Sequence, residues 1–161
     1  MKKLLFITAF TLSLSTVNVQ AQNTDNMFIQ EFSDIEYLSD GYYVVTTISS
    51  DEFITPNANI LTTYSTSKTK TATKHSTYYN SSNKPLWTVN LSATFSYNGS
   101  TSTCTKVSCS VSDIKNGWSL VSKSASKSGN KATGKIQMHQ TGGGNISKTI
   151  TMTCNSNGTL K

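Results

Sequence analysis

The chain contains no arginine, because all 14 of its basic residues are lysine. Only 2 of its 161 residues are proline, and charged residues make up 14% of the chain. These counts exclude collagen-like, proline-rich and coiled-coil chains, and also a highly charged disordered chain. The lack of arginine argues against a nucleic-acid partner, since arginine makes the bidentate contacts to phosphate and guanine.

Sequence motifs that carry chemistry are also missing. The 2 histidines and 3 cysteines do not show the C-x-x-C or H-x-x-x-H spacing of metal sites. Cys109 with His75 or His139 would supply a nucleophile and a base, but no cysteine-protease signature surrounds Cys109. A buried thiol in a strand is the simpler interpretation. We therefore expect no catalytic residue, no metal and no cofactor.

Serine and threonine dominate what is present, with 25 residues of each type. The N-terminus has the three parts of a secretory signal peptide: Lys2 and Lys3, an apolar stretch over 4–14, and the small-x-small cleavage signal at 19–21. The apolar stretch is too short for a spanning helix, and no second one follows. The sequence predicts a signal peptide over 1–21, a secreted protein, and no transmembrane segment after cleavage.

Charge is segregated along the chain. Seven of the 8 acidic residues precede residue 53, whereas 12 lysines and one acid, Asp113, follow from Lys68 onward. One interpretation is a basic face for an anionic partner such as a wall polymer. The other is a set of solvated strand faces, which the scattered positions of the lysines favour.

The clearest structural pattern runs from Trp87 to Tyr97, where apolar residues occupy every odd position and polar residues every even one. This alternation is typical of a half-buried antiparallel strand. The pair Asn98-Gly99 follows at once and predicts a tight hairpin turn, since both residues tolerate positive φ.

Similar patterns, punctuated by turn residues, continue to the C-terminus. Further strands are expected at 35–38, 42–48, 68–79 (an exposed strand), from about 101, at 118–126, at 131–138 and at 146–154, with a short helical turn at 26–32. Regular turns without helical periodicity predict an all-β fold, an immunoglobulin-like antiparallel β-sandwich with a barrel as the alternative. We expect a single β-rich domain over 22–161, with 22–34 poorly ordered.

Several segments combine strand, turn and cysteine motifs: Gly41-Tyr42-Tyr43-Val44, Leu86-Trp87-Thr88-Val89, Thr103-Cys104-Thr105, Lys127-Ser128-Gly129-Asn130-Lys131-Ala132 and Thr153-Cys154-Asn155-Ser156-Asn157-Gly158. In this order they resemble a type of small secreted protein from low-GC Gram-positive bacteria. The likeness covers residues 41–160. It implies a secreted β-rich fold, and it brings no activity with it because its motifs mark strands, turns and cysteines.

Three cysteines in an exported chain predict one disulfide and one remaining thiol. Strand alternation places Cys154 and Cys109 on the inward face, and a bulge at Thr105-Lys106 would turn Cys104 inward as well. Both pairings of Cys154 are therefore open on the pattern alone. The resemblance favours Cys104–Cys154, with Cys109 free or as the alternative partner.

Tyr42, Tyr43, Tyr64, Tyr78 and Tyr79 are the candidates for a ligand surface. Exposed aromatic side chains on a sheet can stack on sugars or on a docked protein. The alternative is cross-strand packing within the sheet.

The sequence thus predicts a secreted, non-catalytic module that binds at the cell envelope or an extracellular surface. Its expected partner is a cell-wall polymer, a glycan or another surface protein, and the pattern leaves the oligomeric state open. The alternative is a secreted effector, either an antagonist toxin or a small hydrolase.

Overall fold

The computed structural model describes residues 28–51 and 67–161, and in this part of the chain the regular structure is β-strand apart from one 3-10 turn, Ser39–Gly41. The strands are β1 (Phe28–Tyr37), β2 (Tyr43–Asp51), β3 (Lys68–Tyr79), β4 (Pro85–Tyr97), β5 (Ser102–Ser112), β6 (Trp118–Ser128), β7 (Lys131–Gln140) and β8 (Asn145–Thr153). No helix in these two ranges is long and apolar enough to cross a membrane. The predicted signal peptide and Tyr64 lie outside the described residues.

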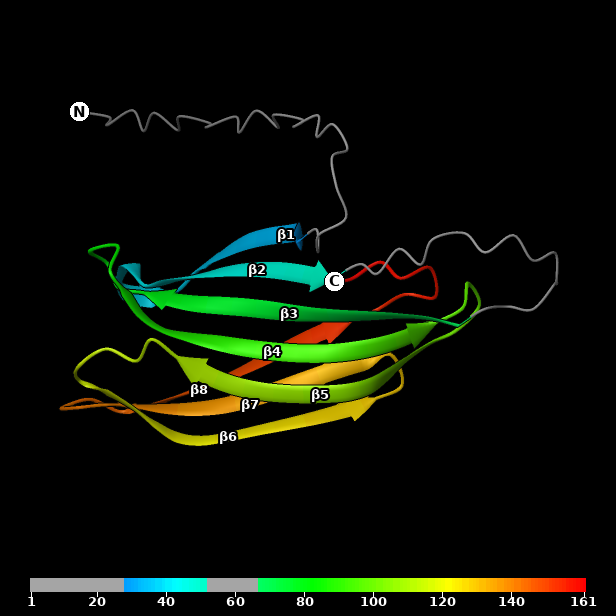
Figure 1. The fold of residues 1–161 in the computed structure, drawn as a ribbon. Helices are drawn as coiled ribbons and strands as arrows, with labels where there is room; N and C mark the ends of the chain where they lie inside the picture. The colour runs from blue at the N-terminus through cyan, green and yellow to red at the C-terminus, as the bar shows by residue number, and fades with distance from the viewer. Residues whose placement is uncertain (1–27, 52–66) are drawn as a thin grey trace, which may run out of the picture.

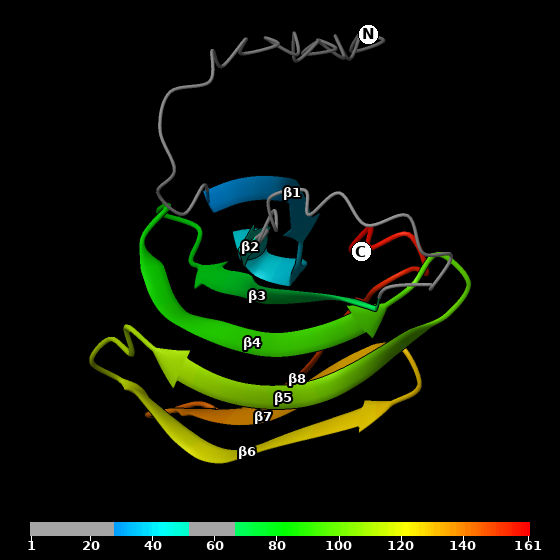
Figure 2. The same cartoon turned by 45° about the vertical axis from the view of Figure 1, so that its right-hand side comes forward.

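The strands form two antiparallel sheets (Figure 1). One has five strands in the order β1-β2-β3-β4-β5, and the other has three in the order β6-β7-β8. Each sheet is therefore a simple meander, and the chain passes from one sheet to the other between β5 and β6. Figure 2 shows β4 and β5 bowed, with β6, β7 and β8 beneath them.

The alternation in β4 explains how the layers form. Burial alternates along this strand from Trp87 to Tyr97, so that one face enters the core and the other carries the polar residues. The strand ends at the predicted turn, where Asn98 Oδ1 accepts hydrogen bonds from the backbone N–H groups of Ser100 (3.0 Å) and Thr101 (2.8 Å). Gly99 adopts a φ of 86°, a conformation that costs glycine little.

One apolar core fills the space between the sheets. Its largest fully buried apolar side chains are Trp87, Phe95, Ile48, Leu91, Met138, Met152, Val44 and Val89. They come from β2 and β4 of the five-stranded sheet and from β7 and β8 of the other. The sheets approach each other closely at Gly134, because a Cβ there would lie 2.9 Å from Cys109 Sγ and 3.2 Å from Leu91 Cδ1.

The predicted bulge in β5 is confirmed. Thr94 pairs with Lys106 and Phe95 pairs with Cys104, which leaves Thr105 as the extra residue. The bulge shifts the strand by one position, so that Cys104 is buried while Cys109 still packs against the core.

Two predictions about single elements were wrong. The helical turn expected at 26–32 is strand from Phe28 onward, because this segment pairs with β2. The strand 68–79 is not an exposed strand, since β3 lies between β2 and β4 and buries Tyr78. The expected poor order of 22–34 stays a prediction, and residues 22–27 lie outside the described part.

The all-β, two-sheet architecture agrees with the predicted sandwich. The two sheets are not closed into the alternative barrel, and they stay separate in the described residues. Immunoglobulin domains connect their strands as Greek keys, whereas both sheets here follow chain order, so an immunoglobulin-like identity is not confirmed.

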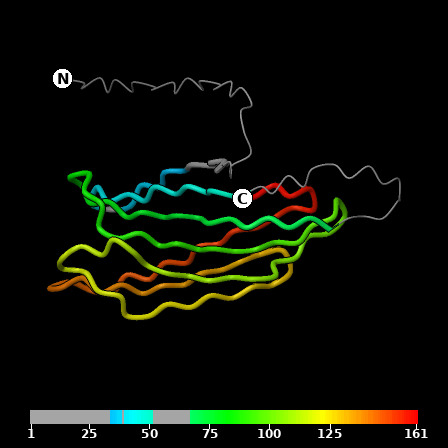
Figure 3. The backbone as a smooth tube through the Cα atoms, viewed as in Figure 1, coloured from blue at the N-terminus to red at the C-terminus, as the bar shows by residue number. Residues whose placement is uncertain are grey.

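The C-terminal tail runs back past the end of β8 at one end of the two sheets (Figure 3). The backbone carbonyl of Ser156 accepts a hydrogen bond from Gly99 N–H at 2.8 Å, which ties the tail to the β4–β5 turn. Gly158 lies against the ring of Tyr97, and Leu160 is buried in the core.

Candidate functional site

The face of the five-stranded sheet that is turned away from β6–β8 is called the outer face. Its side chains follow from the strand register, since residues paired across strands lie on the same face. One row across β2 to β5 is Thr47, His75, Asn90 and Ser110, and the next is Ser49, Thr73, Ser92 and Ser108. These two rows are therefore lined mainly by hydroxyl groups.

Three tyrosines form a stripe at one end of this face, named here the tyrosine stripe: Tyr37, Tyr43 and Tyr79. The rings of Tyr43 and Tyr79 stack, with centroids 4.8 Å apart and planes 3° from parallel. The Tyr37 ring is tilted by 43° and lies 6.1 Å from Tyr43. Tyr37 is 79% exposed, and Ile35 next to it on β1 is 50% exposed, so the stripe ends in an uncovered apolar surface.

The predicted tyrosine surface is only partly assembled. Tyr43 and Tyr79 lie together on the outer face, but Tyr78 points into the core, where it is 4% exposed. Its ring stacks on Trp87 with a centroid distance of 4.1 Å. Tyr42 is half-buried and precedes β2. Cross-strand packing, the alternative interpretation, is thus correct for Tyr78, and it also describes the stack of Tyr43 on Tyr79.

Tyr37 was not among the tyrosines that the sequence analysis named as candidates for a ligand surface. It occupies the last position of β1 and pairs with Tyr43 across the hairpin. The signal was present, because the predicted strands 35–38 and 42–48 are joined by a short turn, and such a hairpin places residues equidistant from the turn side by side.

Hydroxyl groups on neighbouring strands bond to each other along the outer face. The side-chain oxygen pairs are Thr77–Thr88 (3.0 Å), Thr73–Ser92 (2.8 Å), Thr71–Thr94 (3.0 Å) and Ser67–Ser96 (2.8 Å). These pairs all join β3, or the residue just before it, to β4. They fix the rotamers of the hydroxyl rows, so the surface has a defined arrangement of donors and acceptors.

A chain of polar contacts crosses the middle of the face from β3 to β5. His75 Nδ1 lies 2.7 Å from Asn90 Oδ1, and Asn90 Nδ2 donates to Ser112 Oγ at 3.1 Å. Ser112 Oγ in turn donates to Asp113 Oδ2 at 2.9 Å. Because the Asn90 oxygen is an acceptor, His75 must present its Nδ1 as a donor. The chain holds the imidazole in one orientation.

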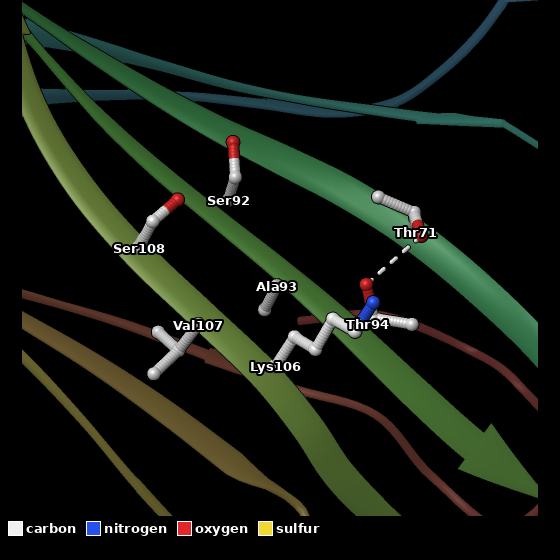
Figure 4. Close-up of a pocket in the computed structure, with 7 residues that line it drawn as sticks. All are labelled: Thr71, Ser92, Ala93, Thr94, Lys106, Val107 and Ser108. Atoms are coloured by element: carbon white, nitrogen blue, oxygen red, sulfur yellow. Dashed lines mark hydrogen bonds between the residues drawn. The ribbon is translucent and has the colours of Figure 1, made fainter.

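The other end of the face contains an open hollow of about 520 Å³ (Figure 4). It is lined by Thr71, Ser92, Ala93, Thr94, Lys106, Val107 and Ser108. The hydroxyl side chains lie on the outer face, whereas Ala93 and Val107 point to the opposite side. Lys106 extends towards Thr94 and provides the one cationic side chain of this lining.

Several lysines are committed to structural contacts. Lys74 Nζ donates to the Thr151 carbonyl of β8 at 3.0 Å, and burial lowers the pKa of Lys74 against the opposing effect of the Asp34 charge. Lys148 forms a 2.8 Å ion pair with Glu36. These lysines bridge the two sheets, which supports the interpretation of scattered structural and solvated lysines over that of one basic face.

The three cysteines are thiols in this structure and no two of them lie at disulfide distance, so the predicted disulfide is not formed in it. Cys104 and Cys154 are nevertheless buried at the two sides of one turn: Cys104 N–H donates to the Gly129 carbonyl (2.7 Å), and Cys154 N–H donates to the Asn130 carbonyl (3.1 Å). Burial raises the pKa of Cys104, and Lys127 opposes this shift. The charge of Cys154 also raises the pKa of Cys104.

The sequence candidates for catalysis do not meet. Cys109 packs on Gly134 inside the core, and burial raises the pKa of its thiol against the charge of Lys123. His75 projects from the outer face, and His139 lies on β7, where its Nδ1 is 2.9 Å from Asn145 Oδ1. Within residues 28–51 and 67–161, no three His, Cys, Asp or Glu side chains gather in a way that could hold a metal ion.

The site is thus a surface: the tyrosine stripe at one end, hydroxyl and amide rows in the middle, and the hollow at the other end. Comparisons with family models, curated proteins and solved structures give no match for this chain.

Proposed function

We propose that the chain is a secreted, non-catalytic module that binds at the cell envelope or an extracellular surface through its outer face. The observation that carries the proposal is the tyrosine stripe, in which Tyr37 is 79% exposed beside the stacked Tyr43 and Tyr79. Exposed apolar surface bordered by polar residues is typical of an interaction site. The leader over 1–21 supports secretion, because it has the order of charge, apolar stretch and small residues that export requires.

Two finer aspects of the scaffold belong to the same proposal. An immunoglobulin-like relationship is supported only by the two stacked antiparallel sheets. Oxidative pairing of Cys104 with Cys154 is supported by their shared position beside the Gly129–Asn130 turn. The alternative of a small hydrolase gains no support from Cys109 and His75, which lie on opposite faces of the five-stranded sheet.

Co-sedimentation of the purified protein with isolated Gram-positive cell walls tests the proposal. We expect the wild type to pellet with the walls and Tyr37→Ala to remain in the supernatant. Val121→Ala is the matched control, since Val121 is 51% exposed on β6 of the other sheet. Retention should persist in high salt, because contacts of the tyrosine ring do not depend on charge. Binding through lysine would instead weaken, since salt screens the attraction between charges. Failure to sediment with walls and with host cells alike would reject surface binding.

A further inference from the structure

We propose that the outer face binds a neutral polysaccharide, laid lengthwise from the tyrosine stripe to the hollow. The proposal rests on the function proposed above and names the chemical class of its ligand. It follows from one juxtaposition: an exposed tyrosine ring, hydroxyl rows held by hydrogen bonds, and a nearly uncharged surface between them.

The tyrosine stripe presents one exposed ring to a ligand. Tyr43 and Tyr79 cover each other by stacking, so that their inner ring faces are closed to a ligand. Tyr37 is tilted against them and keeps its ring exposed. A pyranose has an apolar face of C–H groups, which matches the apolar body of such a ring. We assign the stacking contact to Tyr37.

The hydroxyl rows match the rest of a sugar. A serine or threonine hydroxyl has one donor and two acceptor lone pairs. Each of the pairs Thr77–Thr88 and Thr73–Ser92 uses one donor between its two members, so acceptor capacity and one donor remain in each pair. Sugar hydroxyl groups have the same mixed donor and acceptor character. The rows can therefore bond to a carbohydrate without leaving a group unpaired.

The dimensions favour a chain over a single sugar. Tyr79 and Thr71 lie eight positions apart on β3, which corresponds to about 27 Å along the strand. The hollow beside Thr71 then provides a second contact region at the far end of the same face. A single sugar ring would reach only one of these two regions.

The charge distribution favours a neutral ligand. Apart from the tyrosines, the ionisable side chains assigned to this face are His75 in the middle, Lys106 in the hollow, and Asp51 and Asp113 at its margins. Lysine and carboxylate thus occur together, without the excess of one sign that an anionic or cationic polymer requires. An uncharged polysaccharide does not need such an excess of charge, because it forms no ion pairs with the surface.

Affinity electrophoresis of the purified protein tests the ligand class. Native gels are cast with hydroxyethylcellulose, galactomannan or dextran, and a parallel gel contains anionic polygalacturonate. We expect at least one neutral polysaccharide to retard the wild type, and Tyr37→Ala to weaken this binding about tenfold. Val121→Ala should be retarded like the wild type. The pair Lys131→Gln and Lys135→Gln on β7 should leave retardation unchanged as well.

The remaining outcomes separate this inference from the proposed function. If walls retain the protein through Tyr37 but none of the neutral polysaccharides retards it, the ligand class is wrong and surface binding stands. Retardation by the anionic polygalacturonate alone would likewise show that the ligand is not a neutral polysaccharide, while surface binding would stand. If Tyr37→Ala instead abolishes self-association seen in sedimentation velocity, the outer face is a contact between copies and the inference is overturned. A wild-type protein that neither sediments with walls or host cells nor is retarded in any gel rejects both proposals.

Discussion

At the scale of single residues, Gly158 shows how one backbone position closes the core. It adopts a φ of 89°, and a Cβ there would lie 2.6 Å from Cζ of Tyr97. A side chain at this position therefore meets two penalties, a left-handed backbone and a collision with a buried ring. The C-terminal tail can approach Tyr97 only because this residue is glycine.

We expect Gly158→Ala to lower the free energy of unfolding by about 3 kcal/mol, the sum of both penalties. Gly117→Ala is the matched control, since Gly117 has a φ of 88° and nothing within 4 Å of the added Cβ. That variant should lose only about 1 kcal/mol. Urea unfolding followed by tryptophan fluorescence measures both. Equal losses would mean that the tail moves away from Tyr97 easily.

Tyr78 illustrates what burial does to a phenol. Burial raises its pKa above the ordinary value of 10.0, while the Lys148 charge opposes the shift. The folded state therefore holds the proton more tightly than the unfolded state. Stability from this group is fully present below pH 10 and is lost as the pH rises through the folded pKa.

Alkaline unfolding of Tyr78→Phe tests this linkage. The wild type should lose stability above pH 10, and the variant should lose less over the same interval, because it has no phenol to ionise at this position. Val121→Ala, which changes an exposed side chain that does not ionise, should follow the wild-type curve. The comparison uses the difference between curves, since burial also raises the pKa of Cys104 and Cys109. Parallel curves for wild type and Tyr78→Phe would contradict the assignment.

At the scale of elements, strand faces were predictable and strand neighbours were not. Alternation from Trp87 to Tyr97 determines which residues of β4 are buried, because a strand has a period of two. It contains no information on which strand pairs with it, so the central position of β3 could not be derived. Adjacent residues on one strand face opposite sides, and this rule alone separates Tyr78 from Tyr79.

For the candidate site too, the residues could be named from the sequence, but their neighbours on other strands could not. Tyr43 and Tyr79 were recognised as aromatic candidates, and their stacking required the register Tyr43↔Tyr79 between β2 and β3, which are separated by a long connection. The rows Thr73–Ser92 and Thr77–Thr88 also depend on register between strands. Long-range pairing is thus the information that the sequence pattern lacked.

The turn between β6 and β7 yields a prediction about the cysteines. Its residues Gly129 and Asn130 accept the backbone N–H groups of Cys104 and Cys154 from the two sides. The two thiols are not at disulfide distance in the structure, so this turn has to shift for them to join. We expect oxidised glutathione to convert them to a disulfide, with transfer of two electrons and two protons to give two molecules of glutathione. Cys109, packed on Gly134, should remain a thiol.

Thiol titration of the oxidised, denatured protein should find one thiol, and a non-reducing peptide map should contain the Cys104–Cys154 pair. Reduction should lower the free energy of unfolding by about 3–4 kcal/mol, as expected for a loop of roughly 50 residues. The Cys109→Ser variant should still form the Cys104–Cys154 disulfide, whereas the Cys104→Ser variant should form no disulfide within the chain. Three thiols after oxidation, or a Cys109–Cys154 peptide, would contradict the pairing.

At the scale of the whole molecule, the two sheets depend on one core. Trp87 of the five-stranded sheet and Trp118 of the other lie 6.0 Å apart between ring centroids. Met138 of β7 is fully buried, and Gly134 touches Cys109 and Leu91 of the opposite sheet. Neither sheet can cover its apolar face without the other. We therefore expect residues 22–161 to unfold as the single domain that the sequence predicts.

Unfolding monitored by two probes tests this cooperativity. Far-UV circular dichroism reports both sheets, while fluorescence of Trp118→Phe reports only Trp87, because the chain has 2 tryptophans. The two midpoints should coincide in this variant. Met138→Ala should lower the stability by about 2–5 kcal/mol and shift both probes together, and the exposed Val121→Ala should shift neither. In the Met138→Ala variant, the circular dichroism transition could move while the fluorescence transition stays in place. This result would show that the five-stranded sheet folds without the other sheet. The outer face would then have to be tested on the five-stranded sheet alone.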